Sequence, residues 1–236
     1  MANRVLVVVP VFNEEDNISN VVRDINEVKI KEGIDIEILV VNDCSTDDTL
    51  KIIEKLDCNF LNLPVNLGIG GAVQSGFKFA QLNNFDYMVQ LDGDGQHPSS
   101  ELIKILTPAF QKDADIIIGS RFIDKRGFQS TFIRRIGITY FRFLNRILTR
   151  VNINDSTSGF RIFNRKAIDL ASKYYPDEYP EPEVIVYFLL KGLTLKEIPV
   201  IMKERQGGKS SIDFIKSIYY MIKVSLGVLF VYFKFK

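Results

Sequence analysis

Cysteine is scarce in this sequence, since 236 residues contain only Cys44 and Cys58. Two thiols in a chain of this length do not form a disulfide framework, so a reducing compartment is expected. A secretory leader is not expected either, because the short apolar start at 5–11 runs directly into the polar and acidic stretch 13–16. The sequence therefore predicts a cytoplasmic location.

Long apolar runs are also lacking. The longest run near the C-terminus lies between Lys223 and Lys234 and has ten residues, where a membrane-spanning helix needs about 20. Hydrophobic residues still make up 46% of the chain, which is enough for a packed core. We therefore expect a folded protein that does not cross a membrane by itself.

The chain has almost no net charge, with a formal value of +1, but the two signs are unevenly distributed. Residues 1–120 contain 9 Lys and Arg against 19 Asp and Glu, whereas residues 121–236 contain 21 against 10. The near-neutral total argues against a nucleic-acid binder driven by electrostatics. An acidic half followed by a basic half instead indicates two different ligand surfaces.

Strands and helices are expected to alternate through the first 120 residues. The runs 5–11, 36–41, 60–63, 87–91 and 116–118 are mostly apolar, as in strands buried on both faces, and helical segments separate them. This alternation predicts an α/β fold with a Rossmann-like, mostly parallel central sheet flanked by helices. We expect one domain over residues 1–211 and an amphipathic helix over 212–236.

The sharpest local signal follows the strand at 87–91, where Asp92 and Asp94 flank a glycine. Glycine allows a tight turn and the close approach of a ligand. In open α/β sheets, ligands bind at the carboxyl ends of the strands. Carboxylates at that edge, together with diphosphate oxygens, favour a hard divalent cation such as Mg²⁺ or Mn²⁺. The alternative is a polar turn that only caps a helix.

Polar loops also follow two earlier strands, so three loops can converge on one cleft. Six motifs occur in order between about residues 4 and 165: P-V-F-N-E-E, V-N-D-C-S-T-D-D-T, N-L-G-I-G-G-A-V-Q-S-G, L-D-G-D-G-Q-H-P, I-G-S-R-F and D-S-T-S-G-F-R. Through these motifs the chain resembles the family 2 glycosyltransferases, nucleotide-sugar enzymes of the GT-A fold. The subgroup it resembles most is the polyprenyl-phosphate glycosyltransferases, enzymes like dolichol-phosphate mannose synthase.

The resemblance implies one set of residues for a nucleotide-sugar donor and a metal ion. Donor contacts would come from Pro10, Asn13, Glu14, Asp43, Gly71, Asp92 and Asp94, with Asp43 bonding the base. Mg²⁺ or Mn²⁺ would be held by Asp92, Asp94 and Gln96. Two of these residues also have a local explanation. Glu14 favours a helix N-terminus, and Gly71 suits close packing better than a phosphate cradle.

The resemblance implies a second set for the acceptor and the reaction, which would invert the anomeric centre. Acceptor or phosphate contacts would come from Arg121, Arg134, Arg135, Ser158, Arg161, Arg205 and Lys209, and the catalytic residues would be Asp94, Arg121, Asp155 and Glu183. A sugar hydroxyl needs a general base in order to attack, whereas a polyprenyl phosphate is already an anion. Glu183, or less readily Glu181, would be that base. With a phosphate acceptor, Glu183 would orient the sugar or the metal site.

Two later segments combine basic and apolar residues. At the helical period, Arg135, Arg142, Arg146 and Arg150 share one face of 131–150, with apolar residues roughly opposite. The stretch 212–235 is apolar and aromatic with lysines spaced through it. A core-facing helix explains either segment alone, but the two together, in a chain that resembles lipid-phosphate enzymes, predict peripheral binding to an anionic membrane at its cytoplasmic face. A small membrane-protein partner, or a homodimer through the C-terminal helix, is the other interpretation.

Three rival functions stay open. The first is transfer to a hydroxyl of a lipid-linked saccharide during cell-surface polysaccharide assembly. The second is sugar nucleotidyl transfer, which is disfavoured because acidic residues, rather than a glycine-rich basic loop, follow the first strand. The third is a non-catalytic scaffold, against which the pair Asp92 and Asp94 argues. The sequence identifies neither the sugar nor the base of the donor.

Overall fold

The computed structural model describes residues 3–124, 126–127, 132–176, 180–203 and 214–236. Within this part of the chain, seven strands form one sheet in the order β3-β2-β1-β4-β6-β5-β7. The strands are β1 (Val5–Val11), β2 (Ile36–Asn42), β3 (Asn59–Asn62), β4 (Tyr87–Gln90), β5 (Ile116–Ser120), β6 (Arg161–Asn164) and β7 (Leu195–Pro199).

One strand of the sheet is reversed. β1 to β4 pair in parallel, as do β5 and β7, whereas β6 is antiparallel to both β4 and β5. The mostly parallel sheet is therefore confirmed. Arg161, the first residue of β6, pairs with Gln90 at the end of β4 and with Ile118 near the end of β5. The reversal thus brings the loop before β6 to the edge where the parallel strands end.

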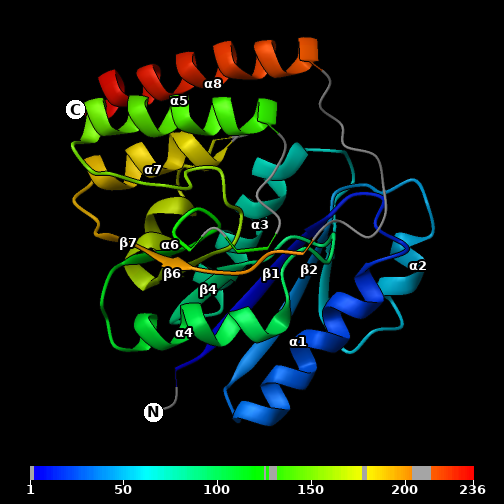
Figure 1. Cartoon of the computed structure of the whole chain (residues 1–236). Coiled ribbons are helices and arrows are strands. Elements are labelled where there is room, and N and C mark those ends of the chain that lie inside the picture. Colours follow the sequence, from blue (N-terminus) through cyan, green and yellow to red (C-terminus); the bar gives the residue numbers. More distant parts are fainter. Residues whose placement is uncertain (1–2, 125, 128–131, 177–179, 204–213) are drawn as a thin grey trace.

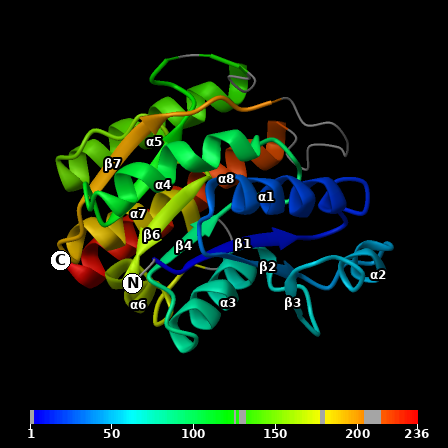
Figure 2. The same cartoon turned by 90° about the horizontal axis from the view of Figure 1, so that it is seen from below.

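Helices cover both faces of the sheet. Helices α1 (Ile18–Glu32) and α4 (Leu102–Phe110) lie on one face, and α3 (Gly68–Leu82) and α6 (Arg165–Ala171) lie on the other (Figure 2). The short α2 (Thr49–Ile53) follows β2, and a 3-10 turn, η1 (Ser99–Glu101), precedes α4. The apolar face of α1 predicted from its spacing is buried, including Ile18, Val22 and Ile25.

Three further helices lie beyond the α3 face. Figure 1 shows α8 (Phe214–Phe235) and α5 (Phe132–Thr149) side by side as the outermost layer, with α7 (Pro180–Leu190) beneath them. Val224, Val228 and Val231 of α8 are fully buried in the same cluster as α7 and the sheet. The predicted boundary at 211/212 lies outside the described residues, and α8 packs onto the rest of the chain.

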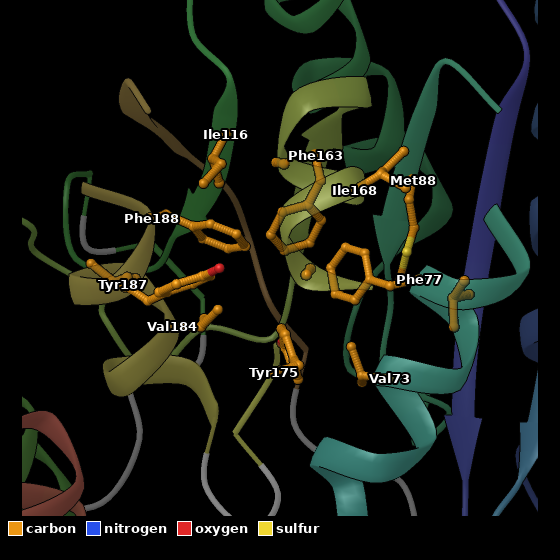
Figure 3. Packing of buried hydrophobic residues seen from close by; sticks show 14 of the residues in the cluster. Val73, Phe77, Met88, Ile116, Phe163, Ile168, Tyr175, Val184, Tyr187 and Phe188 are labelled. Carbon is orange, nitrogen blue, oxygen red and sulfur yellow. The ribbon is translucent and has the colours of Figure 1, made fainter. Parts of the chain in front are cut away.

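The core of this side is rich in aromatic rings (Figure 3). The ring of Phe77 on α3 lies 4.9 Å, edge to face, from that of Phe163 on β6, and 5.1 Å from that of Tyr175. Phe163 is in turn 6.0 Å from Phe188 of α7. Such pairs add about 0.5–1.5 kcal/mol each beyond the area they bury. The rings therefore connect the sheet with the outer helices.

Glycine sets the distance between α3 and β1. A Cβ at Gly76 would lie 2.5 Å from Cγ1 of Val8, so only glycine allows the helix to pack this closely on the strand.

The described helices include none that is long and apolar enough to cross a membrane. Cys44 and Cys58 are both free thiols in the structure.

Candidate active site

The loops after β1 and β2 are bonded to each other at the carboxyl edge of the sheet. Oδ1 of Asn13 accepts a hydrogen bond from the backbone N–H of Thr46 at 2.8 Å. The backbone N–H of Glu14 donates to Oγ1 of Thr49 at 2.9 Å, and both residues are buried. Asn13 has a left-handed backbone, with φ 56°. Asn13 and Glu14, which were predicted to bind the nucleotide sugar, therefore join the two loops. Their contact with a nucleoside stays a prediction.

Asp43 organises the start of α3. Its two carboxylate oxygens accept backbone N–H groups from Leu67 at 2.7 Å and from Gly68 at 2.9 Å. Burial raises the pKa of Asp43 above its usual value, and these two hydrogen bonds oppose the rise. The predicted bond to a base would use the lone pairs that remain, since a carboxylate offers about four.

Gly71 and Pro10 have packing roles in this region. A Cβ at Gly71 would lie 2.5 Å from Cβ of Leu67, so this glycine fits the close-packing interpretation. Pro10 is buried within β1. A Cβ at Gly93 would meet the carbonyl oxygen of Pro10 at 3.3 Å and Cγ1 of Val11 at 2.5 Å. The glycine between Asp92 and Asp94 therefore lets the acidic loop lie directly on the end of β1.

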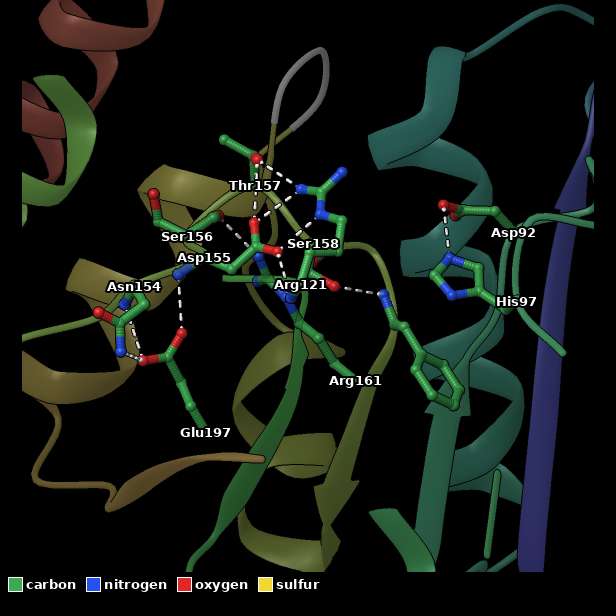
Figure 4. Close-up of polar contacts among 11 residues, drawn as sticks. Asp92, His97, Arg121, Asn154, Asp155, Ser156, Thr157, Ser158, Arg161 and Glu197 are labelled. Carbon is green, nitrogen blue, oxygen red and sulfur yellow. Dashed lines mark hydrogen bonds and ion pairs between the residues drawn. The ribbon is translucent and has the colours of Figure 1, made fainter. Parts of the chain in front are cut away.

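A buried histidine lies beside Asp92. Oδ2 of Asp92 lies 3.4 Å from Nε2 of His97, whose side chain is 1% exposed while that of Asp92 is 36% exposed (Figure 4). The His97 ring packs on Phe160, with centroids 4.8 Å apart. Burial raises the pKa of Asp92, but the neighbouring His97 and the charges of Arg121 and Arg161 outweigh it, so the pKa of this carboxyl lies below its usual value. The Asp92 carboxylate therefore sits among basic side chains.

Asp94 and Gln96 supply the other oxygen donors of this loop. Both side chains are half-buried, and Oδ1 of Asp94 accepts the backbone N–H of Gln96 at 3.1 Å. The described residues contain no cluster of three or more His, Cys, Asp or Glu that could hold a metal ion. Two carboxylates and an amide still fit Mg²⁺ or Mn²⁺, because such ions often take the remaining ligands from substrate phosphates and water.

Arg121, directly after β5, forms a buried pair with Asp155. Nε and Nη2 of Arg121 each lie 2.7 Å from a carboxylate oxygen of Asp155, and the Arg121 backbone N–H donates at 3.1 Å. Their side chains are 13% and 0% exposed. Nη2 also donates to Oγ1 of Thr157 at 3.0 Å. Two predicted catalytic residues are thus brought together, and the fork of the guanidinium has a fixed plane. Contact of Arg121 with phosphate stays a prediction.

Arg161 differs most from its predicted role. Its side chain is among the largest fully buried ones, and Nε and Nη2 donate to the backbone oxygens of Ser158 and Ser156 at 2.7 and 2.9 Å. The guanidinium therefore shapes the loop before β6 from inside. Ser158 is buried in the same loop, where its Oγ accepts the backbone N–H of Phe160 at 3.3 Å.

Glu197 of β7 is a residue that the motifs did not single out. Its Oε1 accepts the backbone N–H of Asp155 at 2.7 Å, and Oε2 accepts the backbone and side-chain N–H groups of Asn154 at 2.7 and 2.8 Å (Figure 4). Glu197 lies about 40 residues beyond this loop in the chain, and no spacing in the sequence connects the two. Only the pairing of β7 with β5 brings them together.

The remaining predicted residues lie on the outer helices or outside the part of the chain that the structure describes. Glu183 is half-buried on α7, and a Cβ added to Gly227 of α8 would overlap its carboxylate. Arg135 is exposed on α5. The side chains of Arg134 and Glu181 lie outside the described part of the chain, as do all atoms of Arg205 and Lys209. The roles predicted for these residues stay predictions.

Comparison with known proteins identifies the family to which the chain belongs. A family model described as glycosyl transferase family 2 matches residues 6–170. The chain therefore belongs to glycosyl transferase family 2, and the protein is a glycosyltransferase. An uncharacterized protein of Methanocaldococcus jannaschii is 33% identical over 84% of this chain and 81% of that protein.

Two relatives carry functional names. A UDP-N-acetylglucosamine–dolichyl-phosphate N-acetylglucosaminyltransferase of Methanococcus voltae is 27% identical over 85% of this chain and 86% of that protein. The polyprenol monophosphomannose synthase of Mycolicibacterium smegmatis is 27% identical over 89% of this chain and 81% of that protein. These matches confirm the resemblance to polyprenyl-phosphate glycosyltransferases.

Solved structures confirm the fold. Glucosyl-3-phosphoglycerate synthase of Mycobacterium tuberculosis, in complex with Mn²⁺, UDP-glucose and phosphoglyceric acid, aligns over 98% of this chain and 80% of that chain. The TM-score is 0.74 at 16% sequence identity. This likeness establishes the GT-A fold for the chain.

Proposed function

We propose that this enzyme transfers a sugar from a nucleotide-sugar donor to the phosphate of a polyprenyl lipid at a membrane surface. The names of the two relatives support this acceptor class, since one includes a dolichyl phosphate and the other a polyprenol. A UDP-sugar in one of those names, and UDP-glucose in the mycobacterial complex, support the donor class. The observation that carries the lipid acceptor is an exposed apolar surface on α5 and α8.

This surface, the α5/α8 face, consists of large apolar side chains that are 38% to 76% exposed. The two helices are adjacent, and the Tyr140 hydroxyl lies 2.9 Å from Oγ of Ser225. Contiguous exposed apolar surface usually marks an interaction site. The members of the face are Tyr140, Phe143 and Ile147 of α5 and Ile222, Leu226, Phe230 and Phe233 of α8.

Positive charge borders the α5/α8 face. Arg135, Arg142, Arg146 and Arg150 are all exposed, and at the helical period Phe143 lies next to them, between the arginines and the more distant Tyr140 and Ile147. Lys234 and Lys236 are exposed at the end of α8. An apolar stripe with a basic border fits an anionic bilayer surface. We therefore propose peripheral membrane binding on the cytoplasmic side.

On the donor side, we propose that the joined loops after β1 and β2 hold the nucleoside, with Asp43 at the base. Asp92, Asp94 and Gln96 would hold a divalent cation, which supplies positive charge to the diphosphate leaving group when bound. Arg121, oriented by Asp155, would add a second positive charge where negative charge develops as the leaving group departs. Both features supply stabilisation specific to the transition state.

On the acceptor side, we propose that a phosphate oxygen of the lipid attacks the anomeric carbon while the bond to the diphosphate breaks. Attack from the opposite face inverts the configuration. The phosphate is ionised near neutral pH, so this attack needs no general base. Glu183 would then orient the sugar. Arg134, Arg135, Arg205 and Lys209 are the basic side chains proposed to hold the acceptor phosphate.

The acceptor is tested by offering three alternatives with Mn²⁺ and a set of nucleotide sugars. Release of nucleoside diphosphate and the lipid product are measured with polyprenyl phosphate, with a lipid-linked saccharide, and with no acceptor. We expect product with polyprenyl phosphate. Product with the lipid-linked saccharide alone would overturn the proposal in favour of a hydroxyl acceptor, for which Glu183 would be the base.

Membrane binding is tested by flotation with anionic liposomes at low and high salt. We expect the wild type to float, and the double variant Leu226→Ser/Phe230→Ser to lose most of its binding. The matched control is Ile30→Ser/Leu82→Ser, which removes apolar side chains that are 81% and 78% exposed elsewhere on the surface. Absence of wild-type binding at both salt concentrations, or equal loss in both variants, would contradict a lipid-binding α5/α8 face.

A further inference from the structure

We propose that Glu197 is a positioning residue that fixes the Asp155–Arg121 pair, and through it the direction in which Arg121 presents its positive charge. The inference rests on the proposed function, because it takes Arg121 as a phosphate contact. It assigns a role to a residue of the edge strand β7 that lies outside all six motifs.

The first link of this arrangement is unusually complete. Glu197 is half-buried, and its two carboxylate oxygens accept three N–H groups at 2.7 to 2.8 Å, all from Asn154 and Asp155. Hydrogen bonds to an ionised acceptor are about twice as strong as those between neutral groups. The carboxylate therefore fixes both the backbone at 154–155 and the Asn154 side chain.

The second link joins that backbone to Arg121. Asp155 is 0% exposed, and its carboxylate accepts the backbone N–H, Nε and Nη2 of Arg121. Separating a buried carboxylate from its partner strongly destabilises the folded protein, so Asp155 and Arg121 are expected to move together. A shift of the backbone at 155 therefore rotates the plane of the guanidinium. Preorganised charge loses its effect in catalysis when it is misplaced by even about 1 Å.

The isosteric substitution Glu197→Gln breaks the first link without leaving a cavity. Glutamine retains one acceptor oxygen and replaces the other with an amide NH₂, a donor that would face an N–H of Asn154 or Asp155. The loop must then shift on one side. The change keeps the side-chain volume, so it probes hydrogen-bond geometry and charge rather than packing.

A matched control lies at the opposite end of β5. Asp115 also binds a neighbouring loop with its carboxylate, which accepts hydrogen bonds from the backbone N–H and the hydroxyl of Thr194 at 2.9 Å and from Nδ2 of Asn164 at 2.8 Å. It precedes β5, whereas Arg121 follows it. Asp115→Asn therefore perturbs a similar set of bonds in the same sheet, away from the carboxyl edge.

The experiment is a double-mutant cycle on the full chain. Rates of nucleoside diphosphate release and thermal unfolding are measured for the wild type, Glu197→Gln, Arg121→Ala, the double variant and Asp115→Asn. We expect Glu197→Gln to lower kcat about 10-fold while the donor KM changes less than about two-fold, the pattern of a lost transition-state contact. We expect no further loss when it is added to Arg121→Ala, because the effect acts through that residue.

Asp115→Asn is expected to lower the melting temperature comparably while kcat stays within about two-fold of the wild type. The inference is overturned if Glu197→Gln lowers kcat equally with and without Arg121, if Arg121→Ala itself leaves kcat unchanged, or if Asp115→Asn lowers kcat as much. Failure of the proposed acceptor is seen separately, in the wild type alone. The cycle is then measured with the acceptor that does react.

Discussion

The acidic and basic halves of the chain use their charges in different ways. In the acidic half, Asp43 accepts backbone N–H groups and Asp94 remains half-buried at the edge of the sheet. In the basic half, Arg121 is paired with Asp155 and Arg161 is enclosed by its own loop. Exposed positive charge in this half includes the arginines of α5 and the lysines at the end of α8.

Charged residues that are counted together along the chain therefore have different roles in the folded structure. The acidic excess includes the oxygen donors proposed for the metal, while the basic excess divides between a preorganised site and a surface. Charge buried in pairs orients groups, whereas exposed charge attracts a partner over about a Debye length. Four predictions test this contrast, in order of decreasing effect.

The largest effect is expected at the acidic edge. Asp94→Asn keeps the size of the side chain but removes its charge, so we expect kcat to fall by about 10²–10³-fold. More Mn²⁺ would also be needed for half-maximal activity. The control is Asp86→Asn before the same strand, where an amide oxygen can still accept the backbone N–H of Arg4. Metal titrations of both variants check the prediction, and wild-type behaviour of Asp94→Asn would contradict the metal role.

A smaller effect is expected where α8 meets α7. The three atoms nearest to a Cβ added at Gly227 all belong to the carboxylate end of Glu183. Gly227→Ala should therefore displace that carboxylate and lower activity about 10-fold, while helix propensity gains about 0.5–1 kcal/mol.

Gly137→Ala in α5 is the matched control for Gly227→Ala, because a Cβ there meets nothing within 4 Å. Activity and melting temperature are measured for both variants. If Gly227→Ala is as active as Gly137→Ala, Glu183 is a helix-packing residue and takes no part in the reaction.

The next prediction concerns the joined loops of the acidic half. Thr49→Val removes the acceptor of the buried Glu14 N–H, and an unsatisfied buried donor lowers the free energy of unfolding by about 1–3 kcal/mol. Urea denaturation measures this change, and the donor KM should rise as the loops separate. Thr107→Val, at an exposed position on α4, is expected to have a much smaller effect.

The smallest effect concerns pH. Burial raises the pKa of Asp115, but hydrogen bonds from Thr194 and Asn164 and the charge of Lys166 bring it below its usual value. The stability that this carboxylate adds is present above the unfolded-state pKa of about 3.9 and is lost as pH falls through the folded-state pKa. Asp115→Asn should therefore flatten the acid side of the curve of unfolding free energy against pH, measured between about pH 6 and 3. An unchanged curve would contradict the assignment.

Much of the first half could be predicted from sequence because its signals are local. The β-branched run at 5–11 predicts a buried strand, and the pair Asp92 and Asp94 marks the loop after β4. Strand β6 could not be predicted in this way. It has four residues, begins with the buried Arg161 and is reversed, so neither length nor alternation reveals it.

Sequence alone determined the fold class and the family, and it named the residues of the candidate site, because periodicity and ordered motifs are written within short stretches of the chain. Only the tertiary structure decided how those residues are used. It paired Arg121 with Asp155, placed Glu197 behind that pair, buried Arg161 and left the apolar stripes of α5 and α8 exposed. The physical reason is that hydrogen bonding, burial and exposure depend on which distant segments become neighbours, and strand order and helix packing set that arrangement.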